Sequence, residues 1–229
     1  MNSEQREQEK VPKYEDFITS VADPVKVISE KEGKLAREHP KILVTLGRKN
    51  MTVKEIHNLF WDSEEKKHTK TIKTIYRYLD ALEEADLVKV AGHRKPVDSR
   101  MTEKLYCRTA IVFFDESQAK EPGWWTTEEG EKQVQKLTTV AQKFFGIAEE
   151  KDSAFQELLR DYFGERTRLT NELLMKMAKE DALAEIFRGH GIDDIKFFIG
   201  TIGELVVFLK QPDLLEQLKQ LINTDPDLL

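Results

Sequence analysis

Cationic and hydroxyl side chains are concentrated in the stretch from residue 66 to residue 84. The apolar residues of this stretch recur at intervals of 3, 4, 7 and 10, which is one face of an α-helix: Ile72, Ile75, Tyr76, Leu79 and Leu82. The opposite face would carry Lys70, Lys73, Thr74 and Arg77. Lysine and arginine bind both phosphates and base edges, so this pattern favours a helix that enters the major groove of DNA.

A second helix with a clear start signal precedes this one. Thr52 and Glu55 have the spacing of a capping box, and the apolar residues that follow predict a helix over residues 52–61. A polar connection over residues 62–68 leads to the helix at 71–84, with Thr69 or Thr71 as its N-cap. Two helices joined in this way have the form of a helix-turn-helix, although the connection is longer than the usual tight turn.

The segment after the second helix predicts two strands around a basic loop. Leu87–Val90 is a short apolar strand, residues 92–100 are rich in turn formers, and residues 105–114 are rich in β-branched and aromatic residues. Helix, helix, strand, basic loop and strand is the element order of a winged helix. The wing would place four side chains beside the minor groove or the DNA backbone: His93, Arg94, Lys95 and Arg100.

Residues 74–88 resemble the recognition-helix signature of ArsR-like winged-helix transcription regulators, and Val21–Val25 is similar to the opening of that family's domain. The resemblance covers about residues 21–114 and implies that the DNA-facing side chains are Thr71, Lys73, Thr74, Arg77 and Tyr78. From the basic stretch itself we also expect Lys67 and Lys70 to contact DNA. Asp86 stands where the family usually has glycine before the strand. The metal-sensing members use a Cys pair or a His-Asp cluster, which this sequence lacks, so we expect no metal site.

The distribution of charge supports a division into two halves. The chain has 229 residues and a net charge of −6. Residues 36–115 hold 16 Lys and Arg against 12 Asp and Glu, a net charge of +4, whereas residues 116–229 hold 14 against 22, a net charge of −8. A basic half can bind phosphate while an acidic half stays away from it. Such charge patterns are also common on solvated faces that bind nothing.

We therefore expect a mainly α protein with a small β-hairpin. The expected parts are an N-terminal arm over residues 1–20, a winged helix-turn-helix domain over 21–117 and an all-helical dimerisation or effector domain over 124–229. Helical spacing is found at residues 14–21 and 23–28, and in a helix that ends at Gly47 and kinks or begins at Pro40. Apolar stripes predict further helices over 126–145, 155–163, 169–187, 195–209 and 212–222, of which 195–209 is apolar nearly all round and should be central.

The motif search favours binding over catalysis. A Gly-rich phosphate loop and the GxSxG, HExxH and CxxC motifs are absent, so we expect no enzyme activity and no cofactor. The single cysteine, Cys107, allows no intrachain disulfide, and neither a membrane span nor a secretory signal is visible, so we expect a cytoplasmic protein. The predicted function is a DNA-binding transcription regulator, expected to be a homodimer on double-stranded DNA, with a possible small-molecule or protein effector at the helical domain. The alternative is a winged-helix protein-interaction module of the transcription machinery.

Overall fold

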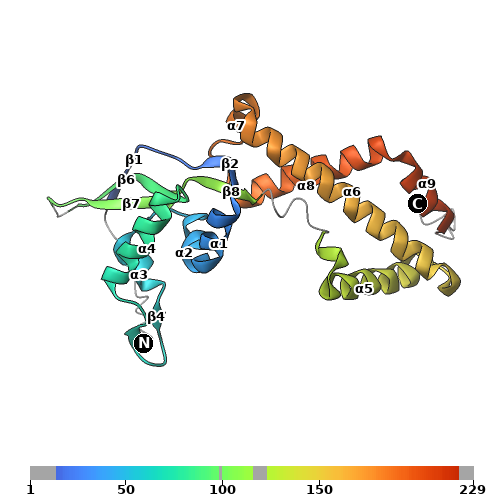
Figure 1. Cartoon of the computed structure of the whole chain (residues 1–229), viewed down its shortest axis with the longest axis horizontal. Coiled ribbons are helices and arrows are strands. Elements are labelled where there is room, and N and C mark those ends of the chain that lie inside the picture. The colour runs from blue at the N-terminus through green and yellow to red at the C-terminus, as the bar shows by residue number, and fades with distance from the viewer. Residues whose placement is uncertain (1–13, 98–99, 116–122, 222–229) are drawn as a thin grey trace, which may run out of the picture. The chain divides into compact units, whose positions relative to one another are not determined.

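The computed structural model describes residues 14–97, 100–115 and 123–221 (Figure 1). The protein is mostly helical, at 62%, with small sheets. The chain divides into two compact units: unit 1 comprises residues 1–23 and 31–111, and unit 2 comprises residues 24–30 and 112–229. Among the described residues, no helix combines the length and the apolar character needed to cross a membrane.

Unit 1 begins its helical part with two short helices. Helix α1 spans Glu30–Glu38 and α2 spans Pro40–Leu46, so the predicted helix break at Pro40 is confirmed. Proline fits the first turn of a helix because its missing N–H has no intrahelical partner there. Ile42, Leu43 and Leu46 of α2 are buried, and the N–H of Gly47 closes the helix by donating to the carbonyl of Leu43.

The next two helices begin at the predicted capping residues. Helix α3 spans Val53–Asn58, and its capping box is formed: the Thr52 side chain accepts from the N–H of Glu55, and the Glu55 carboxylate accepts from the N–H of Thr52 at 2.8 Å. Helix α4 spans Ile72–Glu84 with Thr71 as its N-cap. After α4 the chain turns through Asp86 with φ 50°, the left-handed conformation expected for an aspartate at a helix end.

Unit 1 contains a four-stranded antiparallel sheet. Its order is β1 (Tyr14–Ile18), β6 (Val88–Pro96), β7 (Glu103–Arg108) and β3 (Met51–Thr52). A β-bulge lies between Val90 and Gly92 of β6. Gly92 has φ 153°, and a Cβ there would lie 1.9 Å from the carbonyl oxygen of Phe17, so only glycine allows β1 to approach β6 this closely.

Three sequence-based expectations in this region are wrong. Residues 14–18 form strand β1 and residues 23–28 form strand β2 (Asp23–Ile28), where helical turns were expected. The expected loop at 92–100 is mostly strand, since β6 runs to Pro96 where β1 pairs with it. The expected strand over 105–114 is two strands, because Thr109 interrupts it by donating its hydroxyl to the carbonyl of Asp86, after which β8 (Ala110–Asp115) pairs with β2.

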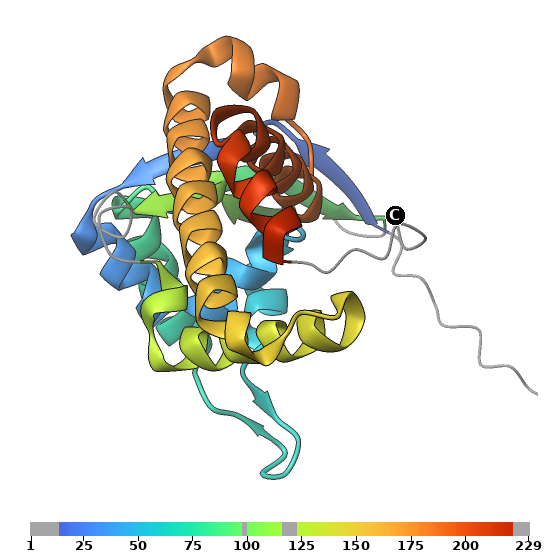
Figure 2. The same ribbon diagram turned by 90° about the vertical axis from the view of Figure 1, so that its right-hand side faces the viewer.

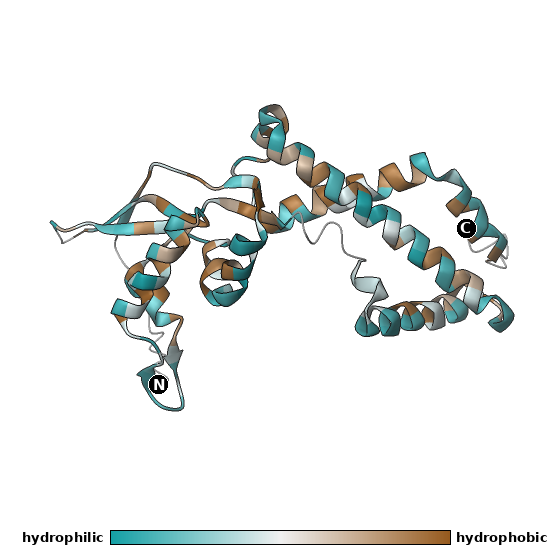
Figure 3. Ribbon diagram, viewed as in Figure 1, coloured by the Kyte–Doolittle hydropathy of each residue, from teal (hydrophilic) through white to brown (hydrophobic). Residues whose placement is uncertain are grey.

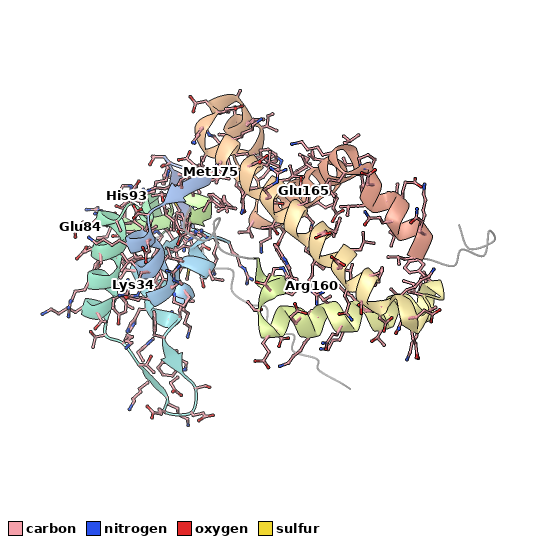
Figure 4. The ribbon with its side chains drawn as sticks, turned by 45° about the vertical axis from the view of Figure 1, so that its right-hand side comes forward. Lys34, Glu84, His93, Arg160, Glu165 and Met175 are labelled. Carbon is pink, nitrogen blue, oxygen red and sulfur yellow. The ribbon has the colours of Figure 1, made fainter. Side chains whose placement is uncertain are left out.

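Unit 2 is built from helices with a common apolar core. They are two 3₁₀ turns, Trp124–Thr126 and Glu149–Lys151, and helices α5 (Glu128–Phe145), α6 (Asp152–Lys179), α7 (Asp181–Phe187), α8 (Ile192–Lys210) and α9 (Pro212–Leu221). Residues of four helices form the core, among them Ala141, Phe155, Leu169, Val207 and Leu214. Figure 2 shows α8 beside the long helix α6. Arg160 of α6, which is labelled in Figure 4, donates to both carboxylate oxygens of Glu131 of α5, at 3.1 and 2.6 Å.

The boundaries of two predicted helices differ from the structure. Helix α6 continues through Gly164, where a stop was expected, because a single glycine weakens a long helix without ending it. Helix α5 begins after Thr127, slightly later than the helix predicted over residues 126–145, and ends at Gly146 with φ 66°. Gly203 of α8 lies close to α6, where a Cβ would be 3.1 Å from the Thr170 hydroxyl, so its small size allows the two helices to pack closely.

Helix α8 is also less buried than its composition predicted. Only four of its residues are buried, all on the side that packs on unit 2: Ile195, Ile199, Gly203 and Val207. Ile192 and Val206 are partly buried, and the other large apolar residues of α8 are exposed to solvent. The central helix expected at residues 195–209 is therefore a partly covered helix, with a second apolar face that its own unit does not bury.

Candidate nucleic-acid interface

Helix α4 presents cations on the side away from the core. Its buried line is Ile75, Leu79 and Leu82. Lys73 and Arg77 are exposed on the opposite side, and Lys70 is exposed directly before the helix. None of these three cations forms an ion pair with another described residue. The N-terminal half of α4 therefore offers unpaired positive charge to solvent.

Two residues expected on the buried face are exposed instead. Ile72 is 42% and Tyr76 is 48% exposed, so the apolar face of α4 is narrower than the sequence predicted. Acidic side chains gather toward the other end of the helix, where Asp80 and Glu83 line a hollow of about 440 Å³ together with Tyr76 and Tyr106. Burial, together with the charge of Glu83, raises the pKa of the Tyr106 hydroxyl. Along α4, the cations are therefore at the N-terminal half, and the acidic residues lie toward the C-terminal end.

Thr71, Thr74 and Tyr78 have structural contacts that limit their freedom. Thr71 is the N-cap, its oxygen accepts from the N–H of Thr74 at 3.2 Å, and the two hydroxyls lie 2.9 Å apart. Tyr78 is half-buried, and its ring centroid lies 4.5 Å from that of His39. Burial lowers the pKa of His39. Thr71 remains exposed, so its hydroxyl could also reach a phosphate, whereas Tyr78 contributes first to packing.

The connection between α3 and α4 is a small hairpin, which the sequence did not predict. Strands β4 (Trp61–Asp62) and β5 (Lys67–His68) pair with each other, and Figure 1 shows the hairpin extending from the ends of α3 and α4. Lys66 turns the chain with φ 50°. Lys67 is exposed on β5, but its Nζ lies 2.8 Å from the Glu65 carboxylate, so its charge is partly compensated.

Two histidines fix the base of this hairpin against α4. The rings of His57 and His68 stack with centroids 3.7 Å apart, and Trp61 meets His68 edge-on at 4.9 Å. Nε2 of His57 donates to the carbonyl of Lys70 at 2.8 Å, and Nδ1 of His68 donates to the carbonyl of His57 at 3.2 Å. A carbonyl can only accept, so both contacts require a protonated nitrogen. The cluster holds the backbone of Lys70 in place immediately before α4.

The predicted wing residues divide between the two faces of β6. His93 and Lys95 are exposed, and Figure 4 shows the position of His93 within unit 1. The bulge at Gly92 sets this alternation, which turns Arg94 to the opposite face, where it is 8% exposed. In register, Lys95 is opposite Glu15 of β1. Arg100 is exposed, and residues 98–99 of the expected loop lie outside the described residues.

Arg94 is held by two carboxylates inside unit 1. Its Nε and Nη2 donate to the two oxygens of Asp16 at 2.6 and 2.8 Å, and its Nη1 donates to Glu55 at 2.8 Å. The guanidinium carbon lies 3.8 Å from the centre of the Tyr14 ring. Hydrogen bonds to Asp16 raise the pKa of Arg94. All three nitrogen atoms of the guanidinium have acidic partners, so the structure places Arg94 inside unit 1 and not among the exposed cations.

Sequence reasoning did not single out Lys104, which is exposed on β7 and lies opposite His93 in register. In the sequence, Lys104 could be recognised only by its alternation with the buried Leu105. This alternation shows that Lys104 belongs to the wing only once β7 is known to pair with β6. Lys54, at the start of α3, is less available because its Nζ lies 2.5 Å from the Glu103 carboxylate, and this contact raises the pKa of Lys54.

Three further features of the described residues bear on chemistry: metal ligands, the cysteine and a tryptophan. Within residues 14–97, 100–115 and 123–221, no group of three or more metal-ligating side chains is close enough to hold a metal ion. Cys107 is buried, and burial raises the pKa of its thiol, as expected for an unactivated cysteine. Trp125 is buried within unit 2, with its ring 6.4 Å from that of Phe163.

Searches against protein-family models and against curated proteins found no match to this chain.

Proposed function

We propose that this protein is a DNA-binding transcription regulator whose unit 1 is a winged helix-turn-helix domain. The order α2, β3, α3, α4, β6, β7 supports this proposal, as does the pairing of β3 with β7 beside β6. The resemblance of residues 74–88 to ArsR-like regulators leads in the same direction. In this proposal β1 is an additional strand that widens the wing, and Asp86 replaces the usual glycine because it adopts the same left-handed turn.

The observation that carries the proposal is the unpaired cationic side of α4. Lys70, Lys73 and Arg77 lie opposite the buried line of the helix and near its N-terminus. Recognition helices contact base edges chiefly through their N-terminal residues, and cations there also meet phosphates. We assign Lys73 and Arg77 to the major groove, and we assign Lys70, Thr71 and Thr74 to its edge.

The exposed side chains of the wing would contact the DNA backbone. These are His93, Lys95, Lys104 and Arg100, of which Lys104 is added from its position on β7. Arg94 is omitted because it links β1 to α3. The acidic half of the chain, with a net charge of −8 over residues 116–229, would stay clear of the duplex.

Fluorescence anisotropy with labelled duplex DNA tests this function. The chain should bind mixed-sequence duplex at low salt, and the logarithm of its affinity should fall linearly with the logarithm of salt concentration. Lys73→Ala and Arg77→Ala should each weaken binding with unchanged circular dichroism, and loss of a phosphate contact should lower the salt slope by about 1. Lys136→Ala removes an exposed lysine of α5 and is the matched control, which should bind like the unchanged chain.

Absence of binding to any duplex at low salt would contradict the proposal and leave a protein-interaction role. If Lys136→Ala and Lys73→Ala weakened DNA binding equally, this would also contradict the proposal, because binding would then depend on the overall charge of the protein and not on contacts made by α4. Recovery and sequencing of genomic fragments bound by the chain would next define the operator.

A further inference from the structure

Helix α8 carries an apolar stripe that its own unit does not cover. Its members are exposed between 37% and 81%: Phe197, Phe198, Ile202, Leu205, Phe208 and Leu209. Figure 3 shows hydrophobic residues recurring along α8. The only charged residue between positions 197 and 209 is Glu204, whose half-exposed carboxylate lies 3.3 Å from Arg166 of α6. The stripe is therefore uncharged along more than three helical turns.

The spacing of this stripe is typical of helix pairing. Phe198, Ile202, Leu205 and Leu209 are separated by four, three and four residues. This is the interval of the seam between two coiled-coil helices, where each side chain inserts between residues of the facing helix. The opposite side of α8 instead repeats every four residues, at Ile195, Ile199, Gly203 and Val207, and packs within unit 2. One helix thus has two apolar faces, and only one is used inside the unit.

We propose that this stripe, Phe197 to Leu209, joins two copies of the chain through a twofold-symmetric α8–α8 contact. A second copy supplies a stripe of the same length and chemistry by symmetry, as an isologous interface requires. An anionic partner such as a lipid headgroup or a nucleic acid is disfavoured, since the stripe has no cation and residues 116–229 have a net charge of −8.

The size of the stripe matches what a stable dimer needs. With about 200 Å² for a fully exposed aromatic side chain, the six residues expose on the order of 500 Å². A standard interface buries about 800 Å² per partner, and somewhat over half of that area is apolar. Apolar patches of this size on a lone chain mark association sites. The dimer does not depend on DNA binding, but it would deliver two copies of α4 to one duplex.

Sedimentation or light scattering of the full chain without DNA tests this interface. The unchanged protein should have twice the chain mass of 26.6 kDa. Leu205→Glu places a charge in the centre of the stripe and should weaken association by about 100-fold or more, giving the monomer mass. Val140→Glu is the matched control: Val140 is 61% exposed on α5, on a different helix of unit 2, and the dimer should persist.

A second variant keeps the test independent of folding defects. Ile202→Cys lies near the middle of the stripe and should form a covalent dimer on mild oxidation, whereas Val140→Cys should not. The native Cys107 is buried and gives little background.

A monomeric mass for the unchanged protein at all concentrations would overturn the proposal, and so would a dimer that survives Leu205→Glu but is lost in Val140→Glu. Because these measurements contain no DNA, their failure is distinguishable from failure of the proposed DNA binding.

Discussion

Arg94 donates two hydrogen bonds to the carboxylate of Asp16, at 2.6 and 2.8 Å, and a third to Glu55. Asp16 lies on β1, Arg94 on β6 and Glu55 in the first turn of α3. The other oxygen of Glu55 accepts from the N–H of Thr52 in the capping box. One guanidinium therefore ties the edge strand of the sheet to the start of the helix that precedes α4.

Arg94→Ala should destabilise unit 1 by about 1–3 kcal/mol, because it leaves two partly buried carboxylates without their partner. The loss should be smaller than for a fully buried pair, since the side chains of Asp16 and Glu55 remain 29% and 33% exposed and water can reach them. Urea unfolding followed by circular dichroism measures the change.

The neighbouring substitution Lys95→Ala is the control for Arg94→Ala. Lys95 is exposed on the same strand, so its loss should change stability by less than about 0.5 kcal/mol. If Arg94→Ala left stability unchanged and weakened DNA binding instead, the assignment of Arg94 to the interior of unit 1 would be wrong.

The helix starts were the part of the fold that the sequence specified best. Thr52 and Glu55 form their capping box, Thr71 caps α4, and Pro40 begins a helix. Each of these signals depends on residues within four positions of each other, so local chemistry decides them. The sequence did not predict strands β1 and β2, because their conformation depends on β6 and β8, which lie far away in the sequence. Short apolar spacings cannot reveal such partners.

The candidate site shows the same limit. Lys73 and Arg77 could be predicted, because the helical period alone places them opposite Ile75 and Leu79. Arg94 could not, because its inward direction depends on the bulge at Gly92 and on carboxylates from two other elements. From the sequence alone, an arginine in a basic, turn-rich segment could equally be an exposed residue of the wing or a buried residue paired with carboxylates.

Gly92→Ala should separate β1 from β6. The new Cβ would lie 1.9 Å from the carbonyl oxygen of Phe17 at a φ of 153°, so the edge strand would have to move. We expect a loss of about 2–4 kcal/mol. Hydrogen exchange of the peptide over residues 14–20 should also accelerate. Gly146→Ala is the matched control: it has φ 66° and no atom within 4 Å of the new Cβ, so it should cost about 1 kcal/mol and leave this peptide unchanged.

His39 should make the stability of unit 1 depend on pH. Burial beside Tyr78 lowers the pKa of His39 in the folded protein. In the unfolded chain the pKa of this histidine is near 6.5, so on acidification the unfolded state binds the proton at a higher pH than the folded state. The contribution of His39 is therefore complete above pH 6.5 and is lost as the pH falls through its lowered pKa. Between pH 7.5 and pH 5.5, which lie about one unit above and below the ordinary histidine pKa, His39→Gln should lose less stability than the unchanged protein.

Urea unfolding at the two pH values, compared with His93→Gln, measures this difference. His93 is exposed on β6 and serves as the control for loss of a histidine. An NMR titration of the His39 ring gives the direct value. A His39 pKa above that of a model peptide would contradict the prediction, since it would require an environment that favours the protonated ring.

Glu65→Gln should strengthen the binding of DNA by the hairpin that precedes α4. Glu65 compensates Lys67 at 2.8 Å, and both side chains are largely exposed, so the pair contributes little to stability. Removing the carboxylate frees the charge of Lys67 and removes a negative charge near the duplex, which should raise affinity about 2–10-fold at low salt. Glu128→Gln breaks the Lys132–Glu128 pair of the same length on α5 and is the control. If both variants raised DNA affinity equally, or if Glu65→Gln did not raise it, the hairpin would not contact the DNA.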